Sequence, residues 1–310
     1  MTRPVSVVMP SLGYVGLLEK SLPPLLEEVG RRALDDEVIV VDDTGEDVLA
    51  AALGADFPTV RVVAREENEG FARALLAGVE AARHELVFSM NTDVIVRPGF
   101  LDPLVACIED SQVFAVSPRI LLDGDDERIE SLTTLRLVGG MVEARHDRDD
   151  SRFEARPVPF AIGGACLLRR AAFLARKGFD SLYEPFYWED VDVCFEAWRS
   201  GGTVLYQPAS VVEHHHRATI GALVDEEVRR AAIEKNRLLF AWKFLDSDEL
   251  LREHVAAVYR LAIDAWLADR HEELVWLDLA LDQLDEALRS RKALGKAKRG
   301  FDEVLGLTSS

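Results

Sequence analysis

The sequence predicts an α/β protein with a Rossmann-like, mixed and mostly parallel central sheet, flanked by helices and followed by a helical C-terminal extension. Short runs rich in valine and isoleucine recur in the N-terminal part, as in strands that are buried on both faces. Segments with helical spacing of apolar residues separate these runs, and this alternation is typical of parallel βαβ units. From about Gly221 onward the apolar pattern is helical throughout.

The N-terminal part alternates strands and helices. Each predicted strand is a short apolar run, and each predicted helix repeats apolar residues three or four positions apart. In sheets of this kind, ligands bind beyond the carboxyl ends of the strands. The predicted strands are Val5–Met9, Glu37–Val41, Val60–Val63 and Glu85–Met90, and the predicted helices are Leu17–Val29 and Phe71–Ala82.

The pattern changes after residue 120. Charged stretches without periodicity predict exposed loops at Asp123–Glu127 and Arg145–Arg156, with a hairpin over Leu132–Val142 between them. We place a soft boundary at residue 220, which gives a sheet-containing domain over 1–220 and a helical region over 221–310 packed on it. The later predicted elements are strands at Ala165–Leu168, Thr203–Tyr206 and Ser210–Val212, and a helix at Glu189–Ser200 that ends at two glycines.

Composition limits the classes of function. The chain has 310 residues, 48% of them hydrophobic, which is enough to bury a large core. Its formal net charge of -19 disfavours nonspecific binding to nucleic-acid phosphates, so we expect no nucleic-acid partner. Three scattered cysteines and the lack of a long apolar run or a signal peptide are typical of a cytoplasmic protein.

Polar residues follow the predicted strands at their carboxyl ends. Asp42 could accept hydrogen bonds from a base or a ribose, although an aspartate that caps a turn is equally common there. Asn68, Gly70 and Arg73 lie around the start of an alanine-rich helix, where the helix dipole favours an anion. A capped helix with a turn glycine is the alternative interpretation.

A metal site is suggested by two distant segments. Asn91, Thr92 and Asp93 end the fourth strand, and an oxygen ligand such as Asp93 suits Mg²⁺ or Mn²⁺. His214 is the best candidate for a nitrogen ligand in the run "HHH", because three adjacent histidines cannot easily bind one ion. A polar turn at Asp93 and an exposed or charge-paired His214 are the alternatives.

The segment "YWEDVDVCFEAW" contains a candidate base. Asp190 lies in the first turn of a predicted helix, where a negative charge also stabilises the helix dipole. The neighbouring Tyr187 and Trp188 could exclude water from Asp190 and so help it to accept a proton. Asp192 lies off the apolar face of the same helix, and we expect it to be solvated.

These segments together resemble a known family. The carrying stretches, in order, are "VSVVMPSLGYVGLLEKSLPPLL", "EVIVVDD", "NEGFARALLAG", "MNTDVIVRPGFLDPLV", "GGACLLRRAAF", "GFDSLYEPFYWEDVDVCFEAW", "VLYQPASVVEHHH" and "EKNRLLFAWK". They cover roughly residues 3–245. The chain resembles the family 2 glycosyltransferases with the GT-A fold, in particular their bacterial rhamnosyltransferase-like branch.

The resemblance implies a role for each candidate position. Asp190 matches the general base of inverting members, and Asp93 and His214 match metal ligands. Asn91 stands where many members have the first aspartate of the metal motif. The positions that match the nucleotide-sugar site and the sugar and acceptor cleft are Pro10, Ser11, Asp42, Asn68, Gly70, Arg73, Asn91, Thr92, Gly163, Gly164 and Ala165.

The implied activity is a metal-dependent inverting transfer from a UDP- or dTDP-sugar, with dTDP-rhamnose as one candidate, to a hydroxyl of a glycan or lipid-linked acceptor. Bacterial surface polysaccharide synthesis is the implied process, with residues 1–220 as the catalytic domain. The basic segment Arg289–Arg299 could contact the inner face of the plasma membrane or a second copy in a homodimer, and a solvated helix is the alternative. A non-catalytic glycosyltransferase-like binding or scaffold subunit and a nucleotidyltransferase are the competing functions.

Overall fold

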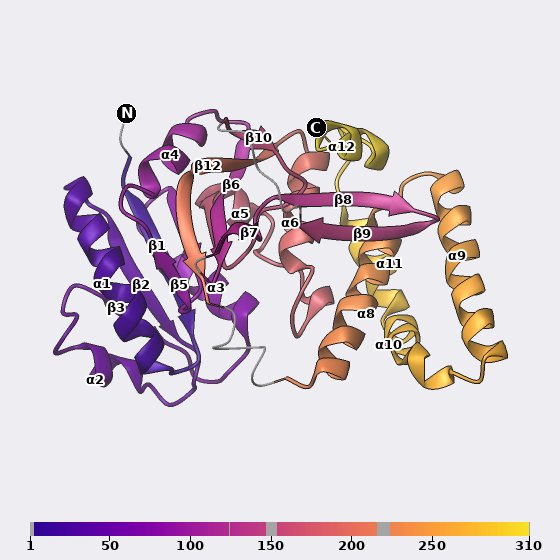
Figure 1. Ribbon diagram of the computed structural model, residues 1–310, viewed down its shortest axis with the longest axis horizontal. Coiled ribbons are helices and arrows are strands. Elements are labelled where there is room, and N and C mark those ends of the chain that lie inside the picture. The colour runs from indigo at the N-terminus through magenta and orange to yellow at the C-terminus, as the bar shows by residue number, and fades with distance from the viewer. Residues whose placement is uncertain (1–2, 124, 147–153, 216–223, 310) are drawn as a thin grey trace.

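A ten-stranded mixed sheet forms the centre of the computed structural model, which describes residues 3–123, 125–146, 154–215 and 224–309 (Figure 1). The strands of the sheet are β1 (Val5–Ser11), β2 (Glu37–Asp42), β3 (Arg61–Ala64), β4 (Leu86–Met90), β5 (Val94–Val96), β6 (Val113–Leu122), β7 (Asp125–Ile129), β10 (Arg156–Pro157), β11 (Ala165–Arg169) and β12 (Thr203–His214). Their order is β10-β12-β6-β11-β4-β1-β2-β3, with β5 paired to β12 and β7 to β6. A separate hairpin joins β8 (Thr133–Val138) and β9 (Met141–His146).

Helices cover both faces of the sheet and form the C-terminal region. Those of the first part are α1 (Val15–Arg32), α2 (Leu49–Leu53), α3 (Phe71–Ala81), α4 (Leu101–Cys107), α5 (Arg170–Ala175), the 3-10 turn η1 (Ser181–Tyr183) and α6 (Glu189–Arg199). The C-terminal region contains α8 (Glu226–Phe244), α9 (Asp248–Leu267), the 3-10 turn η2 (His271–Leu274), α10 (Val275–Asp282), α11 (Leu284–Ala293) and α12 (Phe301–Leu307).

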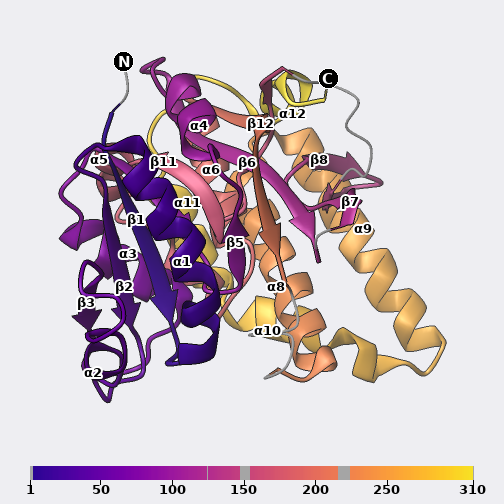
Figure 2. The same cartoon turned by 60° about the vertical axis from the view of Figure 1, so that its left-hand side comes forward.

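The parallel strands β2, β1 and β4 are buried on both faces, as their valine-rich sequences predicted, whereas β3 at the edge of the sheet is partly exposed. Alternate residues of β1 enter two different apolar clusters: Val8 packs with α3, whereas Val7 and Met9 pack with α1 and α4. Figure 2 shows α1 lying over one face of this part of the sheet. The predicted mixed, mostly parallel sheet with flanking helices is therefore confirmed.

One antiparallel strand decides where the site forms. β11 lies between β4 and β6 and runs antiparallel to both, with Ala165 opposite Met90 and Leu167 opposite Val116. Because β11 runs against β4, its first residue lies beside the last residue of β4. The two glycines that precede β11 are therefore brought to the carboxyl edge of the parallel strands.

Several predictions for the second half need correction. The loop predicted at Asp123–Glu127 is wrong from Asp125 onward, because β7 begins there and pairs with the end of β6. The loop at Arg145–Arg156 is wrong at its two ends, which belong to β9 and β10, and residues 147–153 lie outside the described part. Backbone pairing forms these strands without the apolar alternation that would reveal them in sequence.

Other elements of the second half were predicted in part. The hairpin over Leu132–Val142 is confirmed as β8 and β9. The two short strands predicted at residues 203–206 and 210–212 form one strand, β12, whose pairing with β6 shifts register between Gln207 and Val211. The short β5 was not predicted, because its three residues follow directly on the polar end of β4.

The C-terminal helices share a core with the sheet domain. Phe195 of α6 packs against Phe240 and Phe244 of α8, with ring centroids 5.2 and 4.9 Å away, and against Phe301 of α12 at 5.2 Å. Figure 1 shows α8 to α11 grouped beside the β8–β9 hairpin. Within the described residues, no helix is long and apolar enough to cross a membrane.

The basic segment at 289–299 contacts the fold itself. Arg291 donates to the backbone oxygen of Trp242, and Arg299 donates to that of Gly202. The hydroxyl of Ser290 donates to Asp180. At least two of the cations that suggested a membrane or dimer contact are therefore used inside the chain.

The prediction that Asp192 is solvated is wrong. This side chain of α6 is 3% exposed and accepts a hydrogen bond of 2.7 Å from the hydroxyl of Tyr183. The ammonium of Lys243, on α8, lies 2.7 Å from Asp192 and 2.8 Å from Asp180. Burial raises the pKa of Asp192 to about 6, and Lys243 opposes that rise. A cation supplied by a distant helix thus makes the burial of this carboxylate tolerable.

Replacing Lys243 with Met should lower the free energy of unfolding by about 3–5 kcal/mol at neutral pH, because Asp192 is then buried without its cation. Losing the cation raises the pKa of Asp192 further in the folded state. The carboxyl can then take up a proton as the pH falls, and the loss should shrink toward about pH 4. Urea unfolding of wild type and variant at about pH 7 and pH 4.5 measures this.

The double variant Lys243→Met with Asp192→Asn removes both charges, and it should recover part of the stability. If Lys243→Met lowers the free energy of unfolding by less than about 1 kcal/mol, the value typical of an exposed ion pair, the buried pairing with Asp192 does not stabilise the fold as described.

Candidate active site

Asp190 joins α6 to the sheet. One of its carboxylate oxygens accepts a hydrogen bond of 3.0 Å from the backbone N–H of Gly163, and the other accepts one of 2.8 Å from Val191. The hydroxyl of Ser89, on β4, donates to the carbonyl oxygen of Gly163 at 2.5 Å. Strand β4, the glycine pair and the candidate base are therefore linked by consecutive hydrogen bonds.

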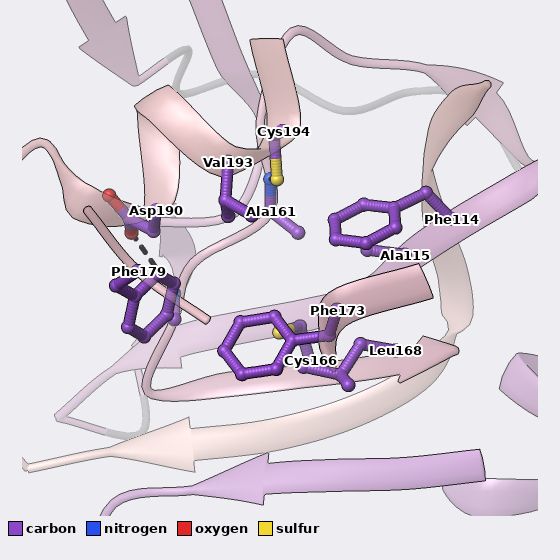
Figure 3. A pocket seen from close by; sticks show the side chains of 11 residues that line it. Phe114, Ala115, Ala161, Cys166, Leu168, Phe173, Phe179, Asp190, Val193 and Cys194 are labelled. Atoms are coloured by element: carbon purple, nitrogen blue, oxygen red, sulfur yellow. Dashed lines mark hydrogen bonds between the residues drawn. The ribbon is translucent and has the colours of Figure 1, made fainter. Parts of the chain in front are cut away.

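The surroundings of Asp190 are largely apolar. Figure 3 shows a small cavity lined by Asp190 together with side chains such as Phe179, Cys166 and Val193. Burial raises the pKa of Asp190, and the N–H of Gly163 opposes that rise. The adjacent Glu189 has its pKa raised to about 8 by burial and then by the charge of Asp190. A carboxylate with a raised pKa is a better acceptor of protons near neutral pH.

Gly164 allows the two strand ends to touch. The backbone N–H of Asn91 donates to the carbonyl oxygen of Gly164 at 2.7 Å. A Cβ atom at Gly164 would lie only 2.4 Å from the side-chain nitrogen of Asn91. Thr92 is buried beside them, in the turn that follows β4. Asn91 and Gly164, predicted as separate parts of one site, are thus in direct contact.

Asp93 and His214 lie side by side, as the metal hypothesis requires. The Nε2 atom of His214 is 3.2 Å from Oδ1 of Asp93, and Nδ1 is 2.8 Å from Oε2 of Glu130. The backbone N–H of His215 also donates to the carbonyl oxygen of Asp93. Burial lowers the pKa of His214, but hydrogen bonds to Asp93 and Glu130 outweigh this effect and raise it to about 10.

These residues fit a divalent metal. Two ligands at right angles, each about 2.1 Å from an ion, are about 3.0 Å apart, close to the spacing of Asp93 and His214. A carboxylate on the second ring nitrogen, here Glu130, is the usual support of a metal-binding histidine. Among the described residues, no set of three or more His, Cys, Asp and Glu could hold a metal. Further ligands would have to be water or the oxygens of a bound substrate.

Glu130 was missed by the sequence analysis. It follows β7 and reaches His214 from a segment that lacks apolar periodicity. Its charge did not distinguish it from the acidic stretch just before it. No signal in a single sequence links Glu130 with His214.

The predicted nucleotide residues gather around the ends of β1 and β2. Pro10 and Ser11 pair with Val41 and Asp42 in these strands. Asp42 is fully buried and accepts hydrogen bonds from the backbone N–H and hydroxyl of Thr44 and from the N–H of Leu49. The turn-capping interpretation therefore describes its present contacts, and its contact with a nucleotide stays a prediction.

The neighbouring Asp43 connects β2 to the start of α3. Its carboxylate accepts a hydrogen bond of 2.9 Å from the N–H of Gly70 and lies 3.0 Å from the guanidinium of Arg65. Asn68 also accepts from Gly70, whose φ of 85° suits glycine. Arg73 extends from the first turn of α3 to Glu184, just before the segment that carries Asp190. Through this contact the start of α3 lies beside the segment that leads into α6.

Residues 6–175 match the family model described as "Glycosyl transferase family 2". The "Probable N-acetylgalactosaminyltransferase 9" of Caenorhabditis elegans is 24% identical over 217 residues, which cover 65% of this chain and 36% of that protein. The chain thus spans about a third of the length of this relative.

Two solved structures share the fold. The "Crystal structure of GalNAc-T7 with UDP, GalNAc and Mn2+" has a TM-score of 0.65 at 17% identity, covering 94% of this chain and 58% of that one. The "Mannosyltransferase PcManGT from Pyrobaculum calidifontis in complex with GDP-Man and Mn2+" has a TM-score of 0.58 at 18% identity, covering 96% and 77%. Both similarities support the GT-A fold.

Replacing Gly164 with Ala should destabilise the protein by about 1–3 kcal/mol, because the new methyl group overlaps the side chain of Asn91. The same substitution in an Asn91→Ala background should cost much less, since the overlapping atoms are gone. Thermal and urea unfolding of the four proteins in this cycle measures the coupling.

Gly16→Ala in α1 serves as the matched control, because nothing lies within 4 Å of the position of its Cβ. Equal effects of Gly164→Ala in both backgrounds would show that the contact with Asn91 does not constrain this position.

Proposed function

Because the chain belongs to glycosyl transferase family 2, we propose that it transfers a sugar from a nucleotide-diphosphate donor to an acceptor hydroxyl with inversion at the anomeric carbon. The observation that carries this proposal is the chain of contacts from Asp190 through Gly163 and Gly164 to Asn91. Through these contacts the partly buried carboxylate of Asp190 is linked to Asn91, two residues before Asp93, which lies against His214.

Asp190 is the proposed general base. It accepts the proton of the acceptor hydroxyl as that oxygen attacks the anomeric carbon, in a single displacement. Its hydrogen bond from Gly163 fixes its orientation, and its apolar surroundings keep its pKa raised. Both effects favour proton transfer near neutral pH.

Asp93 and His214 are the residues proposed to hold a divalent ion, with Glu130 orienting the histidine. When bound, such an ion would stabilise the negative charge that develops on the leaving diphosphate. The Mn²⁺ named for the two structures of similar fold supports this assignment, and Mg²⁺ is the other candidate. Because the raised pKa favours a protonated His214, which must release a proton to solvent before its nitrogen can bind a metal, we expect weak metal binding without the donor.

The donor is proposed only as a nucleotide-diphosphate sugar. The two structures of similar fold are named with different nucleotides and different sugars, UDP with GalNAc and GDP-Man. The sequence-based predictions of dTDP-rhamnose, a lipid-linked or glycan acceptor and surface polysaccharide synthesis stay predictions. So do the cytoplasmic location and the peripheral membrane contact.

A homodimer also stays a prediction. Its strongest support is the exposed apolar surface of the C-terminal region, where Tyr259 and Trp266 are each 66% exposed and Leu267 is 76% exposed. A surface of this kind is often covered by a partner.

Replacing Asp190 with Asn should lower kcat by about 10²- to 10⁴-fold and leave donor affinity within about twofold, because the base is lost while a hydrogen-bond acceptor remains for Gly163. In the wild type, activity should rise with pH as Asp190 loses its proton. Since burial raises the pKa of Asp190, that rise should lie above the titration of an exposed aspartate, about 3.9. Rates of product formation at several pH values measure kcat and its pH dependence, and calorimetry with the donor and Mn²⁺ measures donor affinity.

Glu189→Gln is the matched control. Burial and the charge of Asp190 raise the pKa of Glu189 and so favour its protonated form, which the neutral amide of glutamine mimics closely. Undiminished turnover in Asp190→Asn would exclude this base. Donor binding without transfer to any acceptor would favour a non-catalytic subunit, and pyrophosphate-dependent exchange of the donor would favour a nucleotidyltransferase.

A further inference from the structure

The segment of residues 183–188, which leads into α6, contains a turn with an unfavourable backbone conformation. Tyr187 and Trp188 have φ values of 72° and 76°, in the left-handed region that side chains with a Cβ atom rarely adopt. Asp190 lies two residues after Trp188, in the first turn of α6, so its direction depends on this turn. Such a conformation persists only where the surrounding structure holds it.

Asn236 of α8 supplies that hold. Its side chain is fully buried, and its amide nitrogen lies within hydrogen-bond distance of three backbone carbonyl oxygens of the segment, so one of its two N–H groups is shared between two acceptors. The distances are 2.9 Å to Tyr183, 3.0 Å to Phe186 and 2.8 Å to Tyr187. Carbonyl oxygens only accept hydrogen bonds, so this position requires the donor end of an amide.

The face of α8 that carries Asn236 contacts both this segment and α6. Asn236, Phe240 and Lys243 lie four and three residues apart, which places them on one side of a helix. The ring of Phe240 packs against Trp188 at 5.2 Å, and the ammonium of Lys243 pairs with Asp192. Residues before and after Asp190 are thus held by one helix from the C-terminal region.

Lys235 adds a weaker contact beside Asn236. Its ammonium donates to the carbonyl oxygen of Glu184 at 2.9 Å and to the side chain of Gln283 at 2.8 Å. The carbonyl oxygens of residues 183, 184, 186 and 187 are therefore all bonded to side chains of α8.

We propose that Asn236 is a positioning residue for Asp190, so that α8 is part of the active site. By fixing the turn at residues 186–188, Asn236 keeps the carboxylate of Asp190 against the N–H of Gly163. The catalytic consequence rests on the proposed function, whereas the structural role does not.

The variants Asn236→Ala and Asn236→Asp remove the donor, and Asn236→Asp also sets a carboxylate against the carbonyl oxygens. Both should lower kcat by about 10- to 100-fold, as expected for a displaced base, with donor affinity within about twofold. Hydrogen exchange of the backbone amides of residues 183–192 should accelerate at least about tenfold, and exchange in β1 and β4 should stay unchanged. The rise of kcat with pH should also shift, because the surroundings of Asp190 change.

Leu238→Ala is the matched control for general loss of stability. Leu238 is fully buried in α8 but lies two residues from Asn236, on a different side of the helix. This variant should lower Tm without changing kcat, the pH profile or exchange at residues 183–192.

If the backbone amides of residues 183–192 exchange at the wild-type rate in Asn236→Ala, the proposal is overturned, whatever the activity. It is also overturned if kcat falls in proportion to Tm to the same extent in the Asn236 and Leu238 variants. If the wild type transfers no sugar, the proposed function fails while the exchange measurement still decides the role of Asn236. If the Asn236 variants do not fold, Lys235→Met is the deciding variant. Faster exchange at residues 183–192 would support the claim that α8 fixes this segment, and unchanged exchange would overturn the proposal.

Discussion

The antiparallel pairing of β11 with β4 is the constraint on which the site depends. A sheet of parallel strands alone would present only carboxyl strand ends at this edge. Because β11 enters in the opposite direction, the glycine pair before it meets Asn91 at the end of β4. Gly163 then offers a backbone N–H to Asp190, and Gly164 leaves room for the side chain of Asn91. The antiparallel strand β11 thus joins the proposed nucleotide-sugar and catalytic parts of the active site.

The fully or partly buried carboxylates around this edge each have a defined compensation. Asp190 accepts backbone N–H groups, Asp93 lies against His214, and Asp192 pairs with Lys243. In a chain of net charge -19, unpaired buried carboxylates would be costly. The compensating groups come from other elements, including α8 far along the chain. This is a physical reason why the C-terminal helices and the sheet share one core.

Sequence reasoning succeeded where the signal is local. Valine-rich runs marked the parallel strands, and the polar residues that end them, such as Asn91 and Asp93, do converge with Asp190 and His214 at one edge. It failed where a side chain acts through a distant partner. Asp192 was predicted to be solvated because nothing near it in the sequence indicates a pairing with Lys243. Glu130 likewise had no feature that links it to His214. The strand β7 was missed because backbone pairing, which leaves no side-chain pattern, forms it.

The central claim is that Asp93 and His214 meet a donor-bound metal at the edge that Asp190 faces. A crystal structure with Mn²⁺ and a nucleotide-diphosphate sugar, with the metal located by anomalous scattering, tests it most directly. The account predicts Mn²⁺ within about 2.0–2.3 Å of both Asp93 and His214, bound to diphosphate oxygens, with the anomeric carbon on the side of Asp190. A donor complex in which neither residue approaches the metal or the diphosphate, and His214 stays paired with Asp93, would contradict it.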